Sequence, residues 1–487
     1  MRLPIPFLAL FGLLAAVPYV SAQAPVPDRP PESVAFDFYA RGPWRTDVVR
    51  PATVLGYEPG DFHTSYEAYE RVVRDMAKGT DRLRSFRIGT TPERRAMHLH
   101  AVSAPANLAR LDEIKAAIRR LADPRAAMSD TEREQLIART PVIVWLSTTI
   151  HGDESAGFEA GLHVLYQLLG SDDPSIRTVL ENVVVLLNPC QNPDGHARFV
   201  VWYNAHGRGW AEPFAWEKEN PWNVSGRLNH AYFDLNRDLL VLSQPESRAA
   251  AAALLEWQPQ VVADLHGETP SYFFPPAALP INPNLPRAQL EHWLDVFGRG
   301  NAAAFDRQGW MYFVRDTFDV FYPGYWDSWP SLHGATGMTY ETEGGGKRGL
   351  RTRREDGTLI TLRESIAMHV TASLATLETA ARHRAERLRD FREFFVSSLR
   401  AGGEGPVRRF LFPPESDPVR LAPDGRADAE RDRGWPPRCG GHGDRSPFPR
   451  RRPPSVPDLP GGHSDCGSRA APWSHGAGAV GARLRTG

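Results

Sequence analysis

A histidine and a glutamate three residues apart are the side chains of this chain best suited to bind a catalytic metal ion. His151 and Glu154 come shortly after an apolar run, residues 142–146. A second histidine, His266, comes 112 residues after Glu154 and follows another apolar run, residues 261–263. Two imidazoles and one carboxylate form the ligand set of a catalytic zinc site whose fourth position is open to water. The sequence therefore predicts one zinc ion per chain, bound by His151, Glu154 and His266.

The apolar runs before these residues strengthen the prediction, because a lone His-x-x-Glu occurs by chance in many chains. Here both parts of the ligand set follow an expected buried strand. Sites in α/β sheets gather where strands end and loops begin. The alternative for His151 and Glu154 is a histidine at the start of a helix, followed by an acid in the first turn that interacts favourably with the helix dipole.

The elements that must position the ligands are strands and helices in alternation. We expect strands at residues 82–88, 96–102, 142–148, 182–188, 260–265 and 338–343. We expect helices from residue 64, where Thr64 and Glu67 fit a capping box, and at residues 108–121, 155–169 and 363–400. A further helix is expected to be capped by residues 243–246 and to run to residue 257. Residues 196–235 and the region before residue 338 are expected to be loops. Buried apolar strands alternating with helices predict a mostly parallel sheet covered on both faces.

The first 22 residues have the pattern of a secretory signal peptide: one positive charge, an apolar stretch over residues 3–17, and small residues at 20–22. The alternative, a membrane anchor, needs about 20 apolar residues. This stretch is shorter and contains Pro4 and Pro6. We therefore expect export to the periplasm or the extracellular space. No later segment has the length and apolarity of a membrane span.

The rest of the chain divides by composition. Residues 23–60 are expected to form an N-terminal arm, residues 61–402 the catalytic domain, and residues 403–421 the start of a truncated second domain. In the tail, residues 422–487, 33 of the 66 residues are Gly, Pro or Arg. Two interpretations stay open for this tail, namely native disorder and GC-rich DNA that is read out of frame.

Charge and cysteine content exclude several function classes. The net charge is −1 with both signs interspersed, so there is no electrostatic argument for nucleic acid or a membrane surface as partner. Cys190 is the single cysteine of residues 23–402, so an internal disulfide is excluded there, and it is expected to be a small buried residue. The sequence carries no feature that specifies an oligomeric state.

Four motifs in one order resemble the zinc carboxypeptidase family, the carboxypeptidase A-like metallopeptidases. They are the segments 151–154, 234–237 (Asp-Leu-Asn-Arg) and 339–341 (Thr-Tyr-Glu), together with His266. The resemblance extends over roughly residues 62–400. It implies a three-layer α/β/α sandwich around a mixed, mostly parallel eight-stranded sheet. It also implies hydrolysis of the C-terminal peptide bond of a peptide or protein.

The resemblance assigns catalytic roles outside the ligand set. Glu341 is the expected general base, which takes a proton from the metal-activated water and passes it to the leaving amine. Glu343 would share a strand face with Glu341 and stays an alternative. Arg227 is the candidate cation for the oxyanion of the tetrahedral intermediate. Arg208 is the rival for that role.

The resemblance also assigns substrate contacts. Asn236 and Arg237 would hold the substrate's free carboxylate, which a guanidinium can meet with two parallel hydrogen bonds. Asp234 would accept the second ring N–H of His151 and so fix its tautomer.

Two further positions follow the family pattern less closely. Arg95 matches the arginine of a family Glu-Gly-Arg segment, with Arg94 in place of the glycine. Tyr322 or Tyr325 would be the family's mobile substrate tyrosine. In the family, the Glu-Gly-Arg segment helps to bind extended substrate.

Two other functions stay open. One is a zinc amidohydrolase of the same fold that acts on acylated amino acids or cell-wall peptides, which also possess a carboxylate. The other is a non-catalytic binding protein or fragment, whose hallmark would be a lost ligand or base. None is lost in this sequence.

Overall fold

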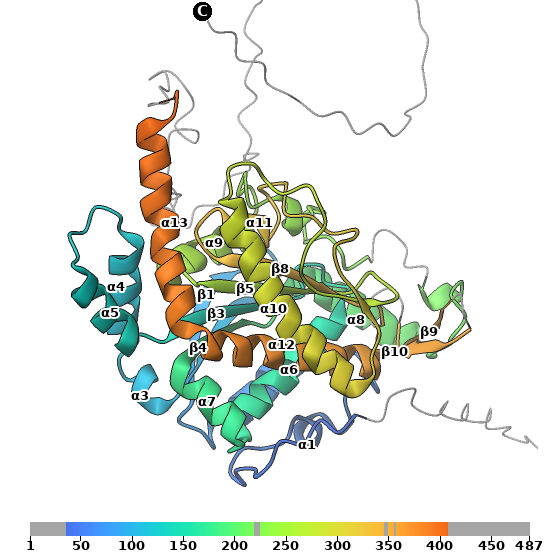
Figure 1. Ribbon diagram of the computed structural model, residues 1–487. Coiled ribbons are helices and arrows are strands. Elements are labelled where there is room, and N and C mark those ends of the chain that lie inside the picture. Colours follow the sequence, from blue (N-terminus) through green and yellow to red (C-terminus); the bar gives the residue numbers. More distant parts are fainter. Residues whose placement is uncertain (1–35, 219–224, 345–348, 355–356, 408–487) are drawn as a thin grey trace, which may run out of the picture. The chain divides into compact units, whose positions relative to one another are not determined.

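The computed structural model describes residues 36–218, 225–344, 349–354 and 357–407 (Figure 1). These residues belong to one compact unit, Met1–Gly425. The predicted signal peptide, residues 1–22, and the tail, residues 422–487, lie outside the described residues. The same holds for residues 23–35 of the predicted arm and residues 408–421 of the predicted second domain.

A mixed eight-stranded sheet forms the centre, in the order β1-β2-β4-β3-β5-β8-β6-β7. Its strands are β1 (Leu83–Thr90), β2 (Ala96–Val102), β3 (Val142–Thr148), β4 (Val183–Asn188), β5 (Val261–His266), β6 (Tyr272–Phe273), β7 (Tyr312–Phe313) and β8 (Thr336–Glu341). The four central strands β4, β3, β5 and β8 are parallel, and the antiparallel pairs lie toward the edges. A separate two-stranded sheet pairs β9 (Arg351–Arg353) with β10 (Leu359–Thr361).

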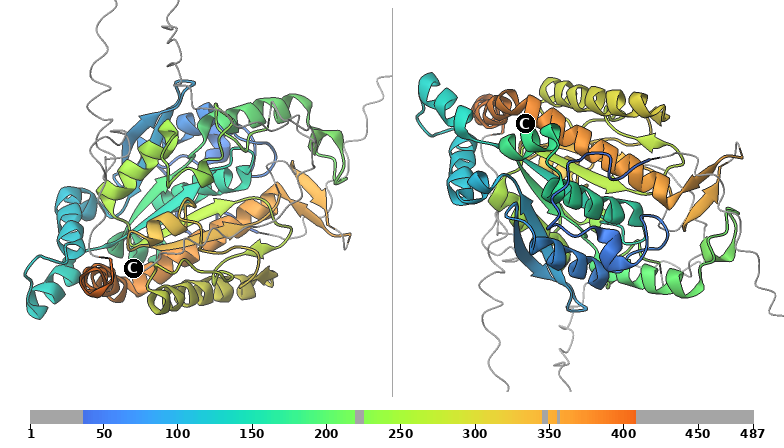
Figure 2. Two further views of the ribbon diagram at one scale, coloured as in Figure 1. Left: turned by 90° about the horizontal axis from the view of Figure 1, so that it is seen from above. Right: turned by 90° about the horizontal axis from the view of Figure 1, so that it is seen from below.

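Helices cover both faces of the sheet (Figure 2). One layer contains α2 (Tyr66–Ala77), α6 (Ser155–Gly170), α7 (Pro174–Asn182), α10 (Arg287–Gln308) and α12 (Leu362–Arg382). The other contains α4 (Leu111–Ala122), α5 (Asp130–Arg139), α9 (Pro245–Trp257) and α13 (Arg384–Glu404). The remaining helices are α1 (Pro51–Leu55), α3 (Pro105–Leu108), α8 (Pro193–His206) and α11 (Ser328–Ser331).

The alternation of side chains along the strands divides the core between the two layers. On β3, Val142, Val144 and Leu146 pack into the first layer, and Ile143 and Trp145 pack into the second. Successive strand residues point to opposite faces, so a strand that is apolar throughout must be covered on both. The predicted fold class, a mostly parallel eight-stranded sheet between two helical layers, is confirmed.

The first predicted helix begins one residue later than its capping box implies. Ser65, not Thr64, is the N-cap of α2, and its hydroxyl accepts a hydrogen bond from the N–H of Ala68. Thr64 instead donates its backbone N–H and its hydroxyl to Glu159 on α6, at 2.5 and 2.8 Å. Thr64, which the sequence assigned to the N-cap, therefore forms a tertiary contact with Glu159 instead of capping α2.

Two regions that were predicted to be loops contain helices, and one predicted helix is divided into two helices. The segment 196–235 includes most of α8, and α10 lies in the region before residue 338. In α8 the buried residues include Asp194 and His196, so this helix lacks the apolar stripe that reveals a helix in a sequence. The helix expected at 363–400 breaks at His383, between α12 and α13.

Two further features of the described residues bear on the predictions. Cys190 is free and buried, as expected. Among the described helices, none combines the length and the apolarity that crossing a bilayer would require.

Candidate active site

The metal-ligand candidates come from the carboxyl ends of neighbouring parallel strands. His151 follows β3, and His266 is the last residue of β5. On the next strand, β8, Glu341 is paired in register with His266. Parallel strands end at the same edge of a sheet, so side chains far apart in the sequence meet there.

The chain leaves β3 through an unusual backbone conformation. Thr149 has φ of 60°, a left-handed value that a β-branched residue rarely adopts. Gly152 lies so close to the start of α8 that an added Cβ would be 2.2 Å from the backbone nitrogen of His196. This tight loop presents His151 toward the centre of the site, and it places Glu154 at the N-terminus of α6.

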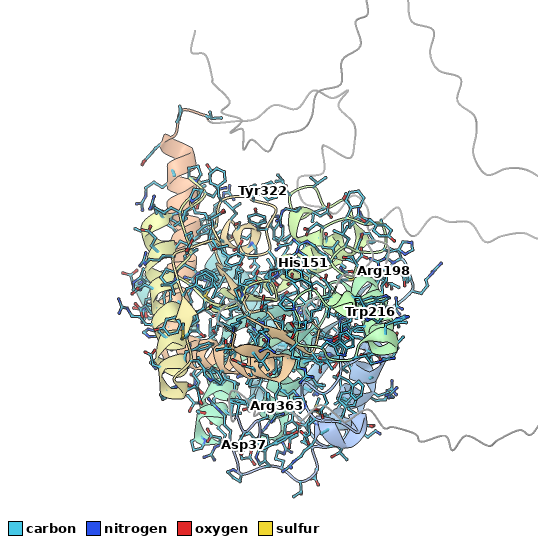
Figure 3. The ribbon with its side chains drawn as sticks, turned by 90° about the vertical axis from the view of Figure 1, so that its right-hand side faces the viewer. Asp37, His151, Arg198, Trp216, Tyr322 and Arg363 are labelled. Atoms are coloured by element: carbon cyan, nitrogen blue, oxygen red, sulfur yellow. The ribbon has the colours of Figure 1, made fainter. Side chains whose placement is uncertain are left out.

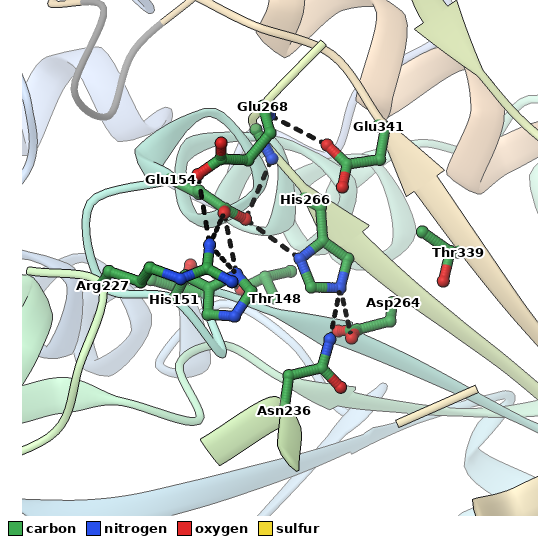
Figure 4. A network of polar contacts seen from close by, with 12 residues as sticks. Thr148, His151, Glu154, Arg227, Asn236, Asp264, His266, Glu268, Thr339 and Glu341 are labelled. Atoms are coloured by element: carbon green, nitrogen blue, oxygen red, sulfur yellow. Dashed lines mark hydrogen bonds and ion pairs between the residues drawn. The ribbon is translucent and has the colours of Figure 1, made fainter. Parts of the chain in front are cut away.

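The three predicted ligands are buried and converge on one point (Figure 4). Nδ1 of His151 is 2.8 Å from one carboxylate oxygen of Glu154, and Nδ1 of His266 is 3.0 Å from the other. The possible ligand atoms of the three residues lie within 4.8 Å of one another. The structure therefore brings the predicted ligand set together.

The remaining ring nitrogens of the two histidines also face carboxylates. Nε2 of His151 is 3.1 Å from Asp234, and Nε2 of His266 is 2.7 Å from Asp264. A carboxylate at the second nitrogen fixes the tautomer that leaves the lone pair of Nδ1 free, as is usual for zinc-binding histidines. The donor set and its orientation therefore fit a zinc ion.

Glu341 is buried and lies beside the ligands. Its carboxylate accepts a hydrogen bond from the N–H of Glu268 at 2.9 Å. Burial raises the pKa of Glu341 to about 8; His266 opposes this shift and Glu154 adds to it. A carboxyl group whose pKa lies near neutrality is suited to both accepting and returning a proton.

The alternative base, Glu343, occupies a different position. The strand expected at 338–343 is β8, which spans Thr336–Glu341, so Glu343 lies beyond its end. Glu341 lines the cavity at the ligand cluster, whereas Glu343 is not among its lining residues. The geometry therefore favours Glu341 over Glu343.

The cavity in front of the ligands has a volume of about 390 Å³. It is lined by both histidines, by Glu341, and by the predicted substrate contacts Asn236 and Arg237. Arg227 also lines it. Most of the predicted functional side chains therefore share one solvent-accessible space.

Arg227 lies against the ligand cluster and is compensated by acidic neighbours. Its guanidinium is 3.0 Å from Asp234, 3.2 Å from Glu268 and 3.6 Å from Glu154. The rival, Arg208, donates its guanidinium to backbone carbonyl groups and is not among the residues that line the cavity. Arg227 is therefore the arginine placed to stabilise negative charge beside the metal ligands.

Asp234 links His151 to Arg227. Burial raises the pKa of Asp234, but its contacts with His151 and Arg227 outweigh burial and lower the pKa below the usual value. Asp234 is therefore a stable anion that can orient both partners.

Asn236 and Arg237 lie at the other side of the cavity, in a short 3₁₀ turn, Leu235–Arg237. The Asn236 amide lies 3.4 Å from Nε2 of His266, and its Oδ1 accepts a hydrogen bond from the N–H of Trp326 at 2.8 Å. The Arg237 guanidinium lies over the ring of Tyr325 at 4.6 Å. Among the described residues, it forms no ion pair with an acidic side chain.

Two predicted substrate contacts are not brought into the cavity. Arg95 forms ion pairs with Glu93 and Asp194 at 2.7 and 2.8 Å. These carboxylates also come near His230, but Arg95 already compensates their charge, so this cluster does not require a metal ion. Tyr322, which is labelled in Figure 3, is not among the residues that line the cavity. Its hydroxyl donates to the carbonyl of Arg237 at 3.2 Å. Tyr325, its alternative, lines the cavity.

Three acidic residues near the site were not assigned from the sequence. Asp264 contacts His266, Glu268 contacts both Arg227 and Glu341, and Asp327 lines the cavity. Asp264 could have been found, because a residue two before a ligand on a strand lies on the same face. The other two lie in loops that carry no periodic pattern.

Comparison with known proteins adds independent information. The zinc carboxypeptidase family model matches residues 69–307, a stretch that contains the three ligand candidates. No curated protein of similar sequence was found. Similar solved structures include a metallo-carboxypeptidase from Pseudomonas aeruginosa (18% identity, 67% of this chain and 70% of that chain, TM-score 0.45). Another is the carboxypeptidase A from Helicoverpa armigera (17% identity, 70% and 78%, TM-score 0.44).

The family assignment rests on the family model together with the converging ligand set. The model ends before Glu341, so the base is assigned by geometry and by its resemblance to the family motif. Residues 69–307 therefore match a zinc carboxypeptidase domain, and the ligand set that they contain fits the zinc cofactor of that family of metallopeptidases.

Proposed function

We propose that this protein is a metallocarboxypeptidase that hydrolyses the C-terminal peptide bond of peptides or proteins. Arg237 carries the proposal. It lines the same cavity as the ligand candidates and Glu341, and among the described residues it forms no ion pair with an acidic side chain. A guanidinium without a carboxylate partner at the wall of a cleft is suited to bind an anion. The free carboxylate of a substrate is the anion that matches it.

The substrate would be held at its C-terminal end. Asn236 and Arg237 bind the carboxylate, which places the last peptide bond in front of His151 and His266. Trp326, which donates to Asn236, fixes the amide of that residue. Such positioning is itself a large part of catalysis, because it replaces a bimolecular encounter.

His151, Glu154 and His266 would hold the zinc ion. When bound, zinc supplies a Lewis acid that polarises the scissile carbonyl group and makes a water molecule a better nucleophile. Glu341 accepts a proton from the attacking water and returns it to the leaving amine. Arg227 stabilises the negative charge that develops on the carbonyl oxygen.

Matched peptides that differ only in a free or an amidated C-terminus test the proposal. Loss of one charge-assisted contact costs roughly 1.5–3 kcal/mol, or on the order of 10–100-fold in kcat/KM. Zinc-loaded protein should therefore cleave the free acids at least 10-fold faster. Arg237→Gln should remove most of this difference. Arg208→Gln, whose guanidinium is outside the cavity, should preserve it.

Equal rates on acids and amides would contradict carboxypeptidase action and favour the same-fold amidohydrolase. The site of action that we propose is outside the cytoplasm. This part of the proposal is supported only by the secretory pattern of residues 1–22.

A further inference from the structure

The loop after β5 places on the substrate cavity a carboxylate that the proposed mechanism does not use. Glu268 comes two residues after the ligand candidate His266 and lines the cavity, and its side chain is 29% exposed. Its carboxylate lies 3.2 Å from the guanidinium of Arg227. Its backbone N–H donates to the carboxylate of Glu341 at 2.9 Å. Glu268 is therefore held beside both the proposed oxyanion arginine and the proposed base.

Glu268 and the proposed carboxylate-binding residues lie on opposite sides of the ligand cluster. In Figure 4, Asn236 lies on one side of His266 and Glu268 on the other. The Asn236 amide is 3.4 Å from Nε2 of His266, whereas Glu154, at Nδ1 of this ring, lies on the side of Arg227. A substrate whose carboxylate is held at Asn236 would therefore pass the ligands with its scissile bond and extend toward Glu268 with the preceding residue.

The distance between Glu268 and Arg227 matches two groups of a single substrate residue. In the residue whose carbonyl group is attacked, three bonds separate the α-nitrogen from the carbonyl oxygen, so these atoms are at most about 4 Å apart. Arg227 is the proposed partner of that oxygen, and Glu268 is 3.2 Å from Arg227. One substrate residue can therefore meet Arg227 with its carbonyl oxygen and Glu268 with its α-nitrogen.

The surroundings of Arg227 favour a substrate group that is positively charged. Three carboxylates lie near its single guanidinium, those of Asp234 at 3.0 Å, Glu268 at 3.2 Å and Glu154 at 3.6 Å. A carboxylate has about four acceptor sites on its two oxygens. Glu268 can therefore keep its contact with Arg227 and accept hydrogen bonds from a substrate as well. Charge complementarity makes a cation the preferred donor at this acidic side of the cavity.

The α-nitrogen of a substrate has two chemical forms that a carboxylate distinguishes. In a dipeptide it is a free ammonium group, with three N–H donors and a positive charge. In a longer or Nα-acylated peptide it is an amide, with one N–H donor and no charge. Hydrogen bonds that involve charged groups are shorter and roughly twice as strong as those between neutral groups. A carboxylate at this position therefore favours the ammonium form.

We propose that Glu268 binds the α-ammonium group of the residue whose carbonyl group is attacked, and so makes the enzyme selective for dipeptides with a free N-terminus. The inference rests on the proposed carboxypeptidase function and names its substrate class. Recognition uses backbone groups of the substrate, so it is independent of the side chains of the dipeptide. Glu268 is a specificity-determining residue here, which binds substrate and takes no part in proton transfer.

The test uses zinc-loaded protein and the alanyl, propionyl and Nα-acetyl-alanyl derivatives of one C-terminal residue, with Leu in one series and Lys in another. The alanyl and propionyl compounds differ only in the ammonium group. We expect kcat/KM to be about 10-fold higher for the alanyl compound than for either of the others. Glu268→Gln keeps the shape and the backbone N–H, and it should lower this ratio by about 10-fold. Glu291→Gln, an exposed change on α10, should leave the ratio unchanged.

The comparison between variant and wild type carries the test. An ammonium group also activates the neighbouring carbonyl group electronically, but this effect is the same in both proteins. Equal loss of all three rates in Glu268→Gln, with the ratio unchanged, would show that Glu268 only holds Arg227 in place and would overturn the inference.

A binding measurement removes the chemical step. In zinc-loaded Glu341→Gln protein, calorimetry should show that alanyl-leucine binds about 10-fold more tightly than propionyl-leucine. Adding Glu268→Gln should abolish the difference. A difference that survives in the double variant would assign the recognition of the ammonium group to another part of the site and would also overturn the inference.

The outcomes also distinguish this inference from the proposed function. If free-acid peptides are cleaved faster than amides but alanyl and propionyl compounds are cleaved equally, the carboxypeptidase proposal stands and the role of Glu268 falls. If acids and amides are cleaved equally, the carboxypeptidase proposal falls first. A wild-type preference for the propionyl compounds would overturn the inference and favour the amidohydrolase that acts on acylated amino acids.

Discussion

The buried carboxylate of Glu159 makes the stability of this protein fall as the pH rises. Glu159 lies on α6, five residues after Glu154, and is 2% exposed. It accepts hydrogen bonds from the backbone N–H and the hydroxyl of Thr64. Burial raises its pKa to about 7 from the ordinary value of 4.5, although both contacts with Thr64 oppose the shift.

The sign follows from comparing proton binding in the two states. Between pH 4.5 and about 7, the folded protein holds a proton on Glu159 that the unfolded chain has lost. Stability therefore falls as the pH rises through this range, and the loss is complete above about 7. A shift of about 2.5 units at 1.36 kcal/mol per unit gives a loss of about 3 kcal/mol.

Glu159→Gln should remove this pH dependence. The amide can accept from the N–H of Thr64 and donate to its hydroxyl, so both contacts survive without a charge. We expect the variant to match the wild type near pH 4.5 and to be more stable by about 3 kcal/mol at pH 8. Urea denaturation of both proteins at each pH, with the same zinc content, measures the difference. Glu291→Gln, an exposed glutamate of α10, is the control and should leave the pH dependence unchanged. A wild-type pH profile that persists in Glu159→Gln would refute this reasoning.

Two further predictions concern the centre itself. Metal analysis should find about one zinc per chain. The double variant His151→Ala and His266→Ala should lose it, because one carboxylate cannot replace the two imidazoles. Stoichiometric zinc in the double variant would exclude this ligand set. Glu341→Gln should keep the zinc and lower kcat by about 10²–10⁴-fold. Glu343→Gln, which changes a residue outside the cavity lining, should lower kcat much less. A larger loss of kcat in Glu343→Gln than in Glu341→Gln would make Glu343 the base.

The metal-ligand candidates were predictable because the sequence contained both the chemistry and its position. The runs before His151 and His266 are apolar without interruption, which is typical of strands buried on both faces. Once such strands are parallel, their carboxyl ends meet at one edge of the sheet. The distance in sequence between Glu154 and His266 therefore did not obscure their convergence.

Of the two helices missed by the sequence reasoning, α10 does carry apolar residues at helical spacing, at Leu290, Trp293, Leu294 and Phe297. The other, α8, lacks such a pattern, and its polar residues are buried by tertiary contacts. On α8, the ring nitrogens of His196 lie 2.9 Å from the carbonyl of Gly152 and 3.0 Å from that of Thr64. Asp194 on the same helix is buried against Arg95 and the hydroxyl of Thr91. Such partners come from distant segments, so the sequence of the helix alone cannot reveal that these polar side chains are satisfied inside the protein.

The same limit explains why Asp327 was not assigned from the sequence. It lies in a loop between α10 and β8 whose sequence has no period. Its depth in the cavity depends on two tertiary facts, the bond to Thr339 and the packing against Gly337. A carboxylate in a loop is most often solvated, so only the folded structure distinguishes this one.

The electrostatics of the ligand cluster give an independent reason why it binds a cation. Burial lowers the pKa of His151, but Glu154 and Asp234 outweigh burial and raise it to about 9. Asp264 and Glu154 likewise raise the pKa of His266 well above its ordinary value, against the effect of burial. Without a metal, the two imidazoles therefore hold protons near neutral pH to compensate the surrounding carboxylates. A zinc ion carries the same two positive charges, and a histidine must lose a proton to become a ligand. Metal binding would thus exchange two protons for one dication and leave the charge balance of this buried cluster unchanged.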